Sequence, residues 1–433
     1  LLSTKRGTQT ELGLARLRAS SPKLRTWGLS ATLGNLEEAL TTLVGVGGEG
    51  SVVHGEIGKR IEIDSLLPER IDRFPWAGHF GTQMVGPVCD EIAKGGTALV
   101  FCNTRAQAEI WFDLIKELRP EWKDEVGLHH GSIDREERDR VELGLKTGTL
   151  RAVIATSSLD LGVDFHPVDR VLQVGSPKGV ARLLQRAGRS GHRPGIPSRV
   201  ICVPTNAMEL VDITAARFAA EAGRIESRHA FDRPLDVLAQ HLVTVASGPG
   251  FREAELKREV RTTSAYRALT DEEWGWTLDF VVRGGESLRA YPEYRRVALA
   301  EDGFYRAADD GAAKRHRMSI GTITSESSIR VQMLKGGNVG TVEETFVSRL
   351  KPGDTFLFAG RALEFVRIKD MTAWVKRARG TPQATPRWSG GRLPLSGELA
   401  DAIREELGHA VDGELRSPEM VAVAPVLALQ NRW

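Results

Sequence analysis

Two arginines near the middle of the chain are the residues best suited to chemistry. Residues 185–193 read QRAGRSGHR, and a helical pattern runs into this stretch over residues 180–187. Guanidinium groups are planar, permanently charged and bidentate, so they match phosphate oxygens and can stabilise a phosphoryl group in transfer. The spacing puts Gln185, Arg186 and Arg189 near one helix face. We predict them as catalytic residues, with Arg189 on the γ-phosphate of a nucleotide; the alternative is a solvated basic helix end.

An earlier segment rich in hydroxyl groups could face both a nucleotide and a nucleic-acid strand. Residues 155–164 read ATSSLDLGVD and follow an apolar run typical of a buried strand. Hydroxyl and N–H groups at a strand end suit a phosphate oxygen of the nucleic-acid backbone. The residues predicted to make this contact are Thr156, Ser157 and Ser158. Gly162 and Asp164 are predicted to contact the nucleotide ribose or to couple to the arginines. The alternative is an ordinary turn capped by serines.

Two further loops follow predicted strands and precede predicted helices. Polar residues there can hold a backbone phosphate, because the first N–H groups of a helix lack partners. The predicted nucleic-acid contacts are Asn103, Thr104 and Arg105 in one loop and His130 and Gly131 in the other. Packing alone is the alternative for both loops. The adjacent histidines at 129 and 130 have no cysteine or acidic support nearby, so we predict no metal site.

Trp388 lies in a turn-rich basic segment, where residues 385–392 read TPRWSGGR. A tryptophan flanked by arginines on a loop can stack on a nucleic-acid base. We therefore predict Trp388 as a nucleic-acid contact. The alternative is that the indole anchors its loop in a core.

The elements between residues 80 and 228 must position most of these residues. Continuous apolar runs alternate with helical patterns, which is typical of a parallel sheet covered on both faces. The predicted strands are residues 97–101, 126–129, 152–155, 170–174 and 198–203. The partly alternating stretch at 52–69 also suggests a strand and an interdomain connector. Function in such sheets lies at the carboxyl ends of the strands, where the polar loops fall.

The remainder of the chain predicts two further folds. Helices at 235–247, 253–260 and 271–284, followed by a strand pair within 291–305, indicate a winged helix. Thr270 and Glu273 are spaced as a capping box for the third helix. Trp274 and Trp276 on the same helix are predicted to pack in the winged-helix core. From residue 314 strand patterns dominate, with strands predicted at 319–324, 328–334, 337–343, 354–367 and 371–377 and a helix at 397–408.

Composition excludes several classes of protein. A chain of 433 residues is too long for one core. Its net charge of +2 gives no overall basic field, so a nucleic-acid site must be a local stripe. Its 3 scattered cysteines suit a cytoplasmic protein without disulfides. No apolar run approaches the roughly 20 residues that a spanning helix needs. The first residue is Leu and residues 426–430 stop in mid-pattern without a cap, which predicts an internal fragment.

These motifs resemble those of the Lhr (large helicase-related) family of superfamily 2 helicases, and within it the branch of ligase-associated DEXH-box helicases. The loops at 103–105, 156–158 and 185–193 carry the resemblance to the superfamily. Further blocks carry the resemblance to the branch: residues 3–7, 27–32, 74–78, 128–132, 157–165, 175–179, 233–236 and 317–321.

The resemblance implies an α/β fold with RecA-like lobes, a winged helix and a β-rich domain. The predicted domains are residues 1–57, the end of a first RecA-like domain; 58–79, a linker; 80–228, the second RecA-like domain; 229–312, the winged helix; and 313–433, a truncated β-rich fourth domain. Ser30 and Thr32 follow a strand-like stretch at 23–29 and are predicted to couple the two RecA-like domains.

The resemblance also implies an ATP-dependent 3′-to-5′ DNA helicase with Mg²⁺ as cofactor. Such a protein translocates on single-stranded DNA, unwinds DNA or RNA–DNA duplexes in DNA repair, and has a DNA ligase or other repair proteins as partners. An RNA-directed helicase and a non-catalytic nucleic-acid-binding scaffold remain open alternatives.

Two departures from the family pattern affect the nucleotide site. The eighth position of the arginine motif is His192 where the superfamily usually has arginine, so His192 or the following Arg193 would supply the second cation. The chain also lacks a G-x-x-x-x-G-K-[ST] loop and an Asp-Glu-x-His box. The Mg²⁺ ligands are therefore expected outside this chain, which is predicted not to hydrolyse ATP alone.

Overall fold

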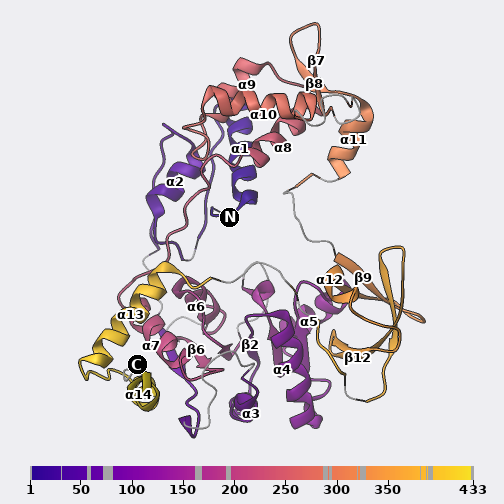
Figure 1. The fold of residues 1–433 in the computed structure, drawn as a ribbon. Helices are drawn as coiled ribbons and strands as arrows, with labels where there is room; N and C mark the ends of the chain where they lie inside the picture. The colour runs from indigo at the N-terminus through magenta and orange to yellow at the C-terminus, as the bar shows by residue number, and fades with distance from the viewer. Residues whose placement is uncertain are drawn as a thin grey trace. The chain divides into compact units, whose positions relative to one another are not determined.

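The computed structural model describes most of the chain. The described residues are 2–30, 32–55, 60–71, 81–160, 168–191, 197–285, 291, 295–318, 320–321, 328–380, 382–386, 388 and 394–430. They divide into two compact units, shown in Figure 1: a first unit of Leu1–Gly55 with Ser227–Ser325, and a second of Glu56–Glu226 with Glu326–Trp433. Each unit is thus built from two stretches of chain.

A six-stranded parallel sheet forms the centre of the second unit. Its strand order is β1-β6-β5-β2-β4-β3. The strands are β1 (Ile61–Ser65), β2 (Ala98–Phe101), β3 (Val126–His129), β4 (Ala152–Ala155), β5 (Arg170–Val174) and β6 (Ser198–Val203). Leu99 on β2 lies in register with Val153 on β4 and Val171 on β5. The predicted parallel sheet is confirmed.

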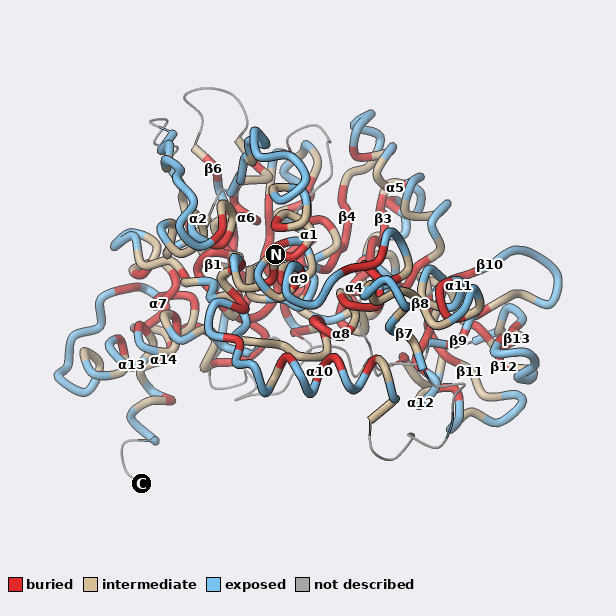
Figure 2. The backbone as a smooth tube through the Cα atoms, turned by 90° about the horizontal axis from the view of Figure 1, so that it is seen from above, coloured by how far each residue is buried: buried red, intermediate tan, exposed pale blue. Residues whose placement is uncertain are grey.

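Helices cover both faces of this sheet because its strands are apolar on both sides. Helices α3 (Val85–Ala93) and α4 (Arg105–Leu118) join the core on one face. Helices α5 (Arg135–Thr147) and α6 (Val180–Ala187) join the core on the other. Strands β3 and β4 are buried along their whole length (Figure 2).

Distant segments complete this lobe. Strand β1 pairs in parallel with β6 as the edge strand of the sheet, within the stretch that the sequence indicated as a linker. Helix α7 (Glu209–Glu221) contacts both α13 (Gly397–Val411) and α14 (Pro418–Gln430), which lie beside it in Figure 1. Helices α7 and α14 were not predicted. No helix among the described residues is both long and apolar enough to cross a membrane.

A buried ion pair ties α14 to the lobe. The Glu419 carboxylate accepts hydrogen bonds from Arg217 on α7, with Nη1 at 3.1 Å, and from Ser65 Oγ at 2.5 Å. Burial raises the pKa of Glu419, but the hydrogen bonds from Arg217 and Ser65 outweigh it and hold the pKa at about 2.

This depressed pKa predicts a specific loss of stability in acid. The Glu419 carboxylate stabilises the fold fully above its ordinary pKa of 4.5, and this contribution disappears as the pH falls through about 2. We expect up to about 3 kcal/mol of unfolding free energy to depend on it. Urea unfolding measured across this window should show a weaker pH dependence for Glu419→Gln than for wild type. The exposed Glu414 provides the control, since Glu414→Gln should leave the pH dependence unchanged.

The first unit contains the predicted winged helix. Helices α8 (Leu235–Ala246), α9 (Glu253–Val260) and α10 (Asp271–Arg283) precede an antiparallel pair of strands, β7 (Val297–Leu299) and β8 (Tyr305–Ala307). Thr270 and Glu273 form the predicted capping box. Helix α11 (Asp310–Met318), which was not predicted, follows β8.

Two tryptophans of α10 have opposite environments. Trp274 is 1% exposed in the core of the winged helix, as the sequence predicted. The same prediction was wrong for Trp276, which is 59% exposed and stacks on Phe280 with ring centroids 5.6 Å apart. The physical reason is the helix period, because residues two apart point to different faces.

The N-terminal stretch packs on the winged helix. Leu12 of α1 (Lys5–Ser20) joins its core, and the buried Glu11 carboxylate accepts the backbone N–H of Ala265 at 3.2 Å. Helix α2 (Leu36–Val44) follows. The strand expected at residues 23–29 is wrong, since no described residue pairs with this stretch as a strand. A strand needs a neighbour for its backbone groups.

A five-stranded sheet forms the rest of the second unit, in the order β10-β9-β13-β12-β11. Its elements are β9 (Ser328–Met333), β10 (Asn338–Glu343), the short helix α12 (Glu344–Val347), β11 (Thr355–Phe358), β12 (Arg361–Lys369) and β13 (Thr372–Arg377). The single strand expected at 354–367 is instead a hairpin, because Ala359 and Gly360 turn the chain with φ of 53° and 64°. The strand expected at 319–324 lies mostly outside the described residues.

Candidate nucleotide and nucleic-acid site

Most of the predicted site residues lie at one edge of the six-stranded sheet. Its strands are parallel, so their carboxyl ends meet at the same edge. The loops after β2, β3 and β4 start at Cys102, His130 and Thr156, and the arginine segment follows helix α6. Sequence reasoning placed these loops correctly because it placed the strand ends correctly.

Arg186 is buried inside its own lobe. It is 1% exposed, and its Nε and Nη2 donate to the two carboxylate oxygens of Asp160 at 2.8 and 3.3 Å. Nη1 donates to Gln173 Oε1, and the guanidinium lies 4.6 Å from the ring centre of Phe101. A buried cation must keep such partners. This geometry suits a positioning role for Arg186 rather than the predicted contact with a nucleotide.

Arg189 occupies a different environment. It is half-buried, and its Nη2 donates to the backbone carbonyl of Asp160 at 2.9 Å. Asp160 therefore holds Arg186 by its carboxylate and Arg189 by its main chain. Gln185 is half-buried on α6. Asp160 lies within the 155–164 segment, but the sequence analysis predicted no role for it. No local signal pointed to its role, because Asp160 lies 26 residues before Arg186 in the sequence.

Four residues predicted near the nucleotide cannot be placed. Gly162 and Asp164, together with His192 and Arg193, lie outside the described residues. Their predicted roles at the ribose and the phosphate stay predictions.

The amino end of α6 is fixed by an acidic residue far along the chain. The buried Glu226 carboxylate accepts the backbone N–H groups of Val180 and of Ala181, the latter at 2.6 Å. It also accepts Ser396 Oγ, at the start of α13, at 2.8 Å. A negative charge is favourable at a helix N-terminus, where N–H groups lack partners. Sequence reasoning missed Glu226, although Gly179 before α6 offered no capping side chain.

The hydroxyl groups after β4 face different surroundings. Ser157 is exposed, whereas Thr156 is buried. Ser158 Oγ lies 2.8 Å from Nδ1 of His129 and donates to the His129 carbonyl at 3.1 Å. Burial lowers the pKa of His129, while the hydrogen bond with Glu142 opposes that shift. Of these three predicted contacts, Ser157 is therefore the hydroxyl most open to a strand.

In the loop after β2, two of the predicted residues hold the loop itself. Asn103 Nδ2 donates to the carbonyl of Ser176 at 2.8 Å. Thr104 caps α4, where its Oγ1 accepts the N–H of Gln107 at 3.1 Å. Asn103 and Thr104 are therefore engaged within the lobe, whereas Arg105 extends to Ser132 and Trp388.

Three predicted nucleic-acid residues meet in one cluster. Arg105 Nη1 donates to Ser132 Oγ at 2.8 Å, and its Cζ lies 5.6 Å from the ring centre of Trp388. The His130 ring stands edge-on to Trp388 with centroids 5.7 Å apart. Trp388 is half-buried against the five-stranded sheet, beside Phe358. The indole therefore packs its loop beside Arg105 and His130, two residues predicted to contact nucleic acid. Gly131 is exposed next to this cluster.

The predicted coupling residues lie in the first unit. Ser30 and Thr32 are described, and Ala31 between them is outside the described residues. Their role between two RecA-like domains stays a prediction.

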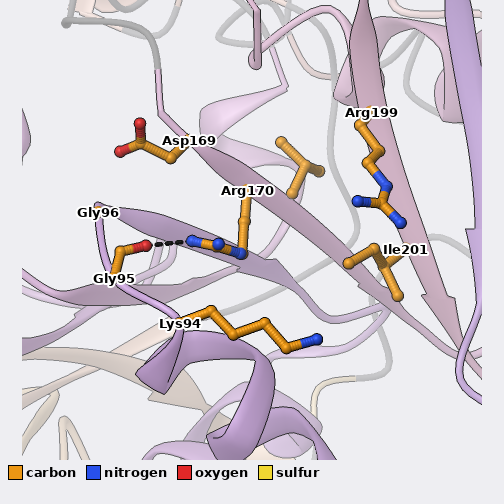
Figure 3. Close-up of a pocket in the computed structure, with 8 residues that line it drawn as sticks. Lys94, Gly95, Gly96, Asp169, Arg170, Arg199 and Ile201 are labelled. Atoms are coloured by element: carbon orange, nitrogen blue, oxygen red, sulfur yellow. Dashed lines mark hydrogen bonds between the residues drawn. The ribbon is translucent and has the colours of Figure 1, made fainter.

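A polar hollow opens at the opposite, amino edge of the sheet (Figure 3). Its volume is about 330 Å³, and its lining includes Lys94, Arg170 and Arg199. These cations already have partners: Arg170 donates to the Gly95 carbonyl, and Arg199 Nε lies 2.5 Å from Asp64 Oδ2. Lys94 pairs with Glu91. The hollow lies away from the loops described above, and we assign it no part in the nucleotide site.

Comparisons with known families agree with this arrangement. Residues 83–194 match the helicase conserved C-terminal domain, and residues 218–385 match the winged helix domain of the large helicase-related protein. A RecA-like lobe carrying these motifs, joined to a winged helix, defines a superfamily 2 helicase.

Individual relatives narrow the assignment. The chain is 33% identical to the ATP-dependent helicase Lhr-Core protein 2 of Thermococcus barophilus, over 92% of this chain and 47% of the relative. It is 32% identical to the ATP-dependent helicase Lhr-Core of Methanocaldococcus jannaschii, over 99% of this chain and 50% of the relative. The chain belongs to the Lhr-type helicases, and it spans about half the length of these curated relatives.

A solved structure of similar fold is the helicase Lhr of Mycobacterium smegmatis bound to ssDNA and AMP-PNP. The TM-score is 0.73 at 26% sequence identity, over 100% of this chain and 54% of that one. The predicted fold class, a RecA-like lobe with a winged helix and a β-rich domain, is confirmed. The narrower ligase-associated branch stays a prediction.

Proposed function

We propose that the protein to which this chain belongs is an ATP-dependent DNA helicase that moves 3′ to 5′ along single-stranded DNA. It would unwind DNA or RNA–DNA duplexes in DNA repair. The observation that carries this proposal is Asp160, which joins the loop of Ser157 to the segment of Arg189. A residue suited to a strand and a residue suited to a phosphate are thereby fixed to one another.

ATP would supply the free energy for each step, and this chain would contribute cations to its site. Arg189 would contact the terminal phosphate, since a partly exposed guanidinium fork matches phosphate oxygens. Asp160 would carry the resulting movement to the loop of Ser157. The family resemblance implies that Mg²⁺ would be held by residues outside this chain.

The strand would follow the carboxyl edge of the sheet. The hydroxyl of Ser157 and the backbone of Gly131 are exposed there and suit phosphate oxygens. Arg105 would add a cation, and the half-buried indole of Trp388 would stack on a base. Cysteines 89, 102 and 202 are free and buried, which suits the cytoplasm. The branch resemblance supports a DNA ligase or another repair protein as partner.

Removal of the indole tests this surface. We expect Trp388→Ala to weaken single-stranded DNA binding by about tenfold, because one base loses its stacking partner. Fluorescence anisotropy of a labelled oligonucleotide measures this. Trp276→Ala is the matched control, since Trp276 is exposed on α10, outside this edge.

Salt dependence and strand chemistry complete the test. Wild-type binding should weaken steeply as salt rises, because phosphate contacts release counterions. A flat salt titration, or unchanged binding by Trp388→Ala, would contradict the proposed surface. In the full-length protein, ATP hydrolysis stimulated by RNA strands and not by DNA strands would indicate an RNA-directed helicase. Strand binding with no hydrolysis at all would indicate a scaffold.

A further inference from the structure

The loop after β3 is shared between the six-stranded and the five-stranded sheets. The N–H of Asp134 donates to the Val339 carbonyl at 3.1 Å, and the N–H of Thr341 donates to the Ser132 carbonyl at 2.9 Å. Ile133 pairs in antiparallel fashion with Gly340. The approach is so close that a Cβ on Gly340 would lie 2.0 Å from the Ser132 oxygen. The loop that bears His130 and Gly131 is therefore an extension of the five-stranded sheet.

A second junction is built around one carboxylate. Glu109 on α4 is 0% exposed, and its two oxygens accept the backbone N–H groups of Ala359 at 2.6 Å and Gly360 at 2.8 Å. Its Oε1 also lies 3.0 Å from Nε2 of His130. Gly360 has φ +64°, and a Cβ there would lie 2.3 Å from Cε1 of Phe112. The turn between β11 and β12 is thus seated directly on α4.

This arrangement gives a buried anion partners from both sheets at once. A carboxylate without solvent must have all of its partners supplied by the protein. Two of those partners come from the β11–β12 turn, and the third is His130, which is predicted to contact nucleic acid. Phe358, which ends β11, lies 6.1 Å from Trp388 between ring centroids. The carboxylate is therefore connected, through one turn and one ring, to the indole on one side and to the imidazole on the other.

We infer that Glu109 is a positioning residue that clamps the five-stranded sheet to the RecA-like lobe and sets Trp388 against Arg105 and His130. The inference rests on the proposed function, because it assumes that these three side chains receive a strand. The edge that binds nucleic acid is then assembled before any DNA binds. The six-stranded and five-stranded sheets move as one body during the ATP cycle. Glu109 itself touches neither strand nor nucleotide.

Two variants release the clamp by different means. Glu109→Gln keeps the shape but replaces one acceptor oxygen by an amide that cannot accept an N–H. Gly360→Ala leaves Glu109 intact and forces the turn away from Phe112. Both should speed hydrogen exchange at the amides of Ala359 and Gly360, measured by mass spectrometry. In the full-length protein, both should raise the single-stranded DNA concentration for half-maximal ATP hydrolysis by about tenfold. The maximal rate should change less than about twofold.

The control and the outcomes separate this inference from the proposed function. Gly337→Ala, in the β9–β10 hairpin, meets open space and should change neither exchange nor strand dependence. Faster hydrogen exchange at the β11–β12 turn, with an unchanged DNA concentration for half-maximal ATP hydrolysis, would overturn the positioning role of Glu109. A tenfold fall in the maximal rate of ATP hydrolysis, with the half-maximal DNA concentration unchanged, would also overturn it. That pattern would indicate damage to the nucleotide site. Failure of wild type to bind strands would instead refute the proposed function, and this inference with it.

Discussion

Arg189→Ala is expected to lower ATP hydrolysis by the full-length protein by about 10³-fold or more, the effect typical of an arginine finger. Single-stranded DNA binding should change little, because the residues proposed to contact DNA lie on other loops. The physical reason is that alanine leaves the charge on the terminal phosphate without its guanidinium. Steady-state ATPase assays and oligonucleotide anisotropy, run on the same preparations, measure the two quantities.

Two further variants show whether the guanidinium fork is what matters. Arg189→Lys keeps the charge and loses the bidentate fork, so its rate should fall between wild type and Arg189→Ala. Arg199→Ala removes an exposed arginine at the opposite edge of the sheet, where it pairs with Asp64, and should retain full activity. Hydrolysis that survives in Arg189→Ala would remove Arg189 from the nucleotide site.

Arg186→Ala is expected to act first on folding. It leaves the Asp160 carboxylate buried without its main partner, and breaking a buried pair in this way costs about 3–5 kcal/mol. The Gln173 oxygen also loses a donor. Urea or thermal unfolding of the chain measures the loss.

A double variant separates the charge from the packing. Arg186→Met with Asp160→Asn removes both charges and keeps most of the volume, so it should be more stable than Arg186→Ala. Both variants should lower ATP hydrolysis, since Asp160, whose carbonyl accepts a hydrogen bond from Arg189, is no longer fixed by the Arg186 guanidinium. If Arg186→Ala proved as stable as wild type and yet failed to hydrolyse ATP, that result would support the predicted catalytic role of Arg186.

The sequence predicted the parallel sheet well because its signal is local. The runs at 126–129, 152–155, 170–174 and 198–203 are buried on both faces apart from Arg170 and Arg199 near their starts, so nearly every residue contributes to the pattern. The polar loops then fall at one edge as a consequence of parallel order. Arg105 and His130 come to this edge through that placement, whereas their contacts with Trp388, which packs against the five-stranded sheet, could not be foreseen.

The remaining features depend on contacts between residues distant in the chain. Strand β1 is defined by pairing with β6, and α14 by packing under α7. The burial of a side chain cannot be read from its residue type alone, which is why the sequence could not show that Arg186 is buried and Trp276 exposed. The roles of Asp160, Glu109 and Glu226 share this origin, since each carboxylate is defined by partners that approach from elsewhere.

The two-part construction of the RecA-like lobe has a consequence for biosynthesis. Helices α13 and α14 cover α7, yet the ribosome makes them roughly two hundred residues after it, at speeds of about 5–20 residues per second. During that interval the winged helix can fold as it leaves the ribosome. The apolar side of α7 that α13 and α14 cover remains exposed to solvent. A nascent chain halted before residue 397 would therefore be a natural client for a chaperone.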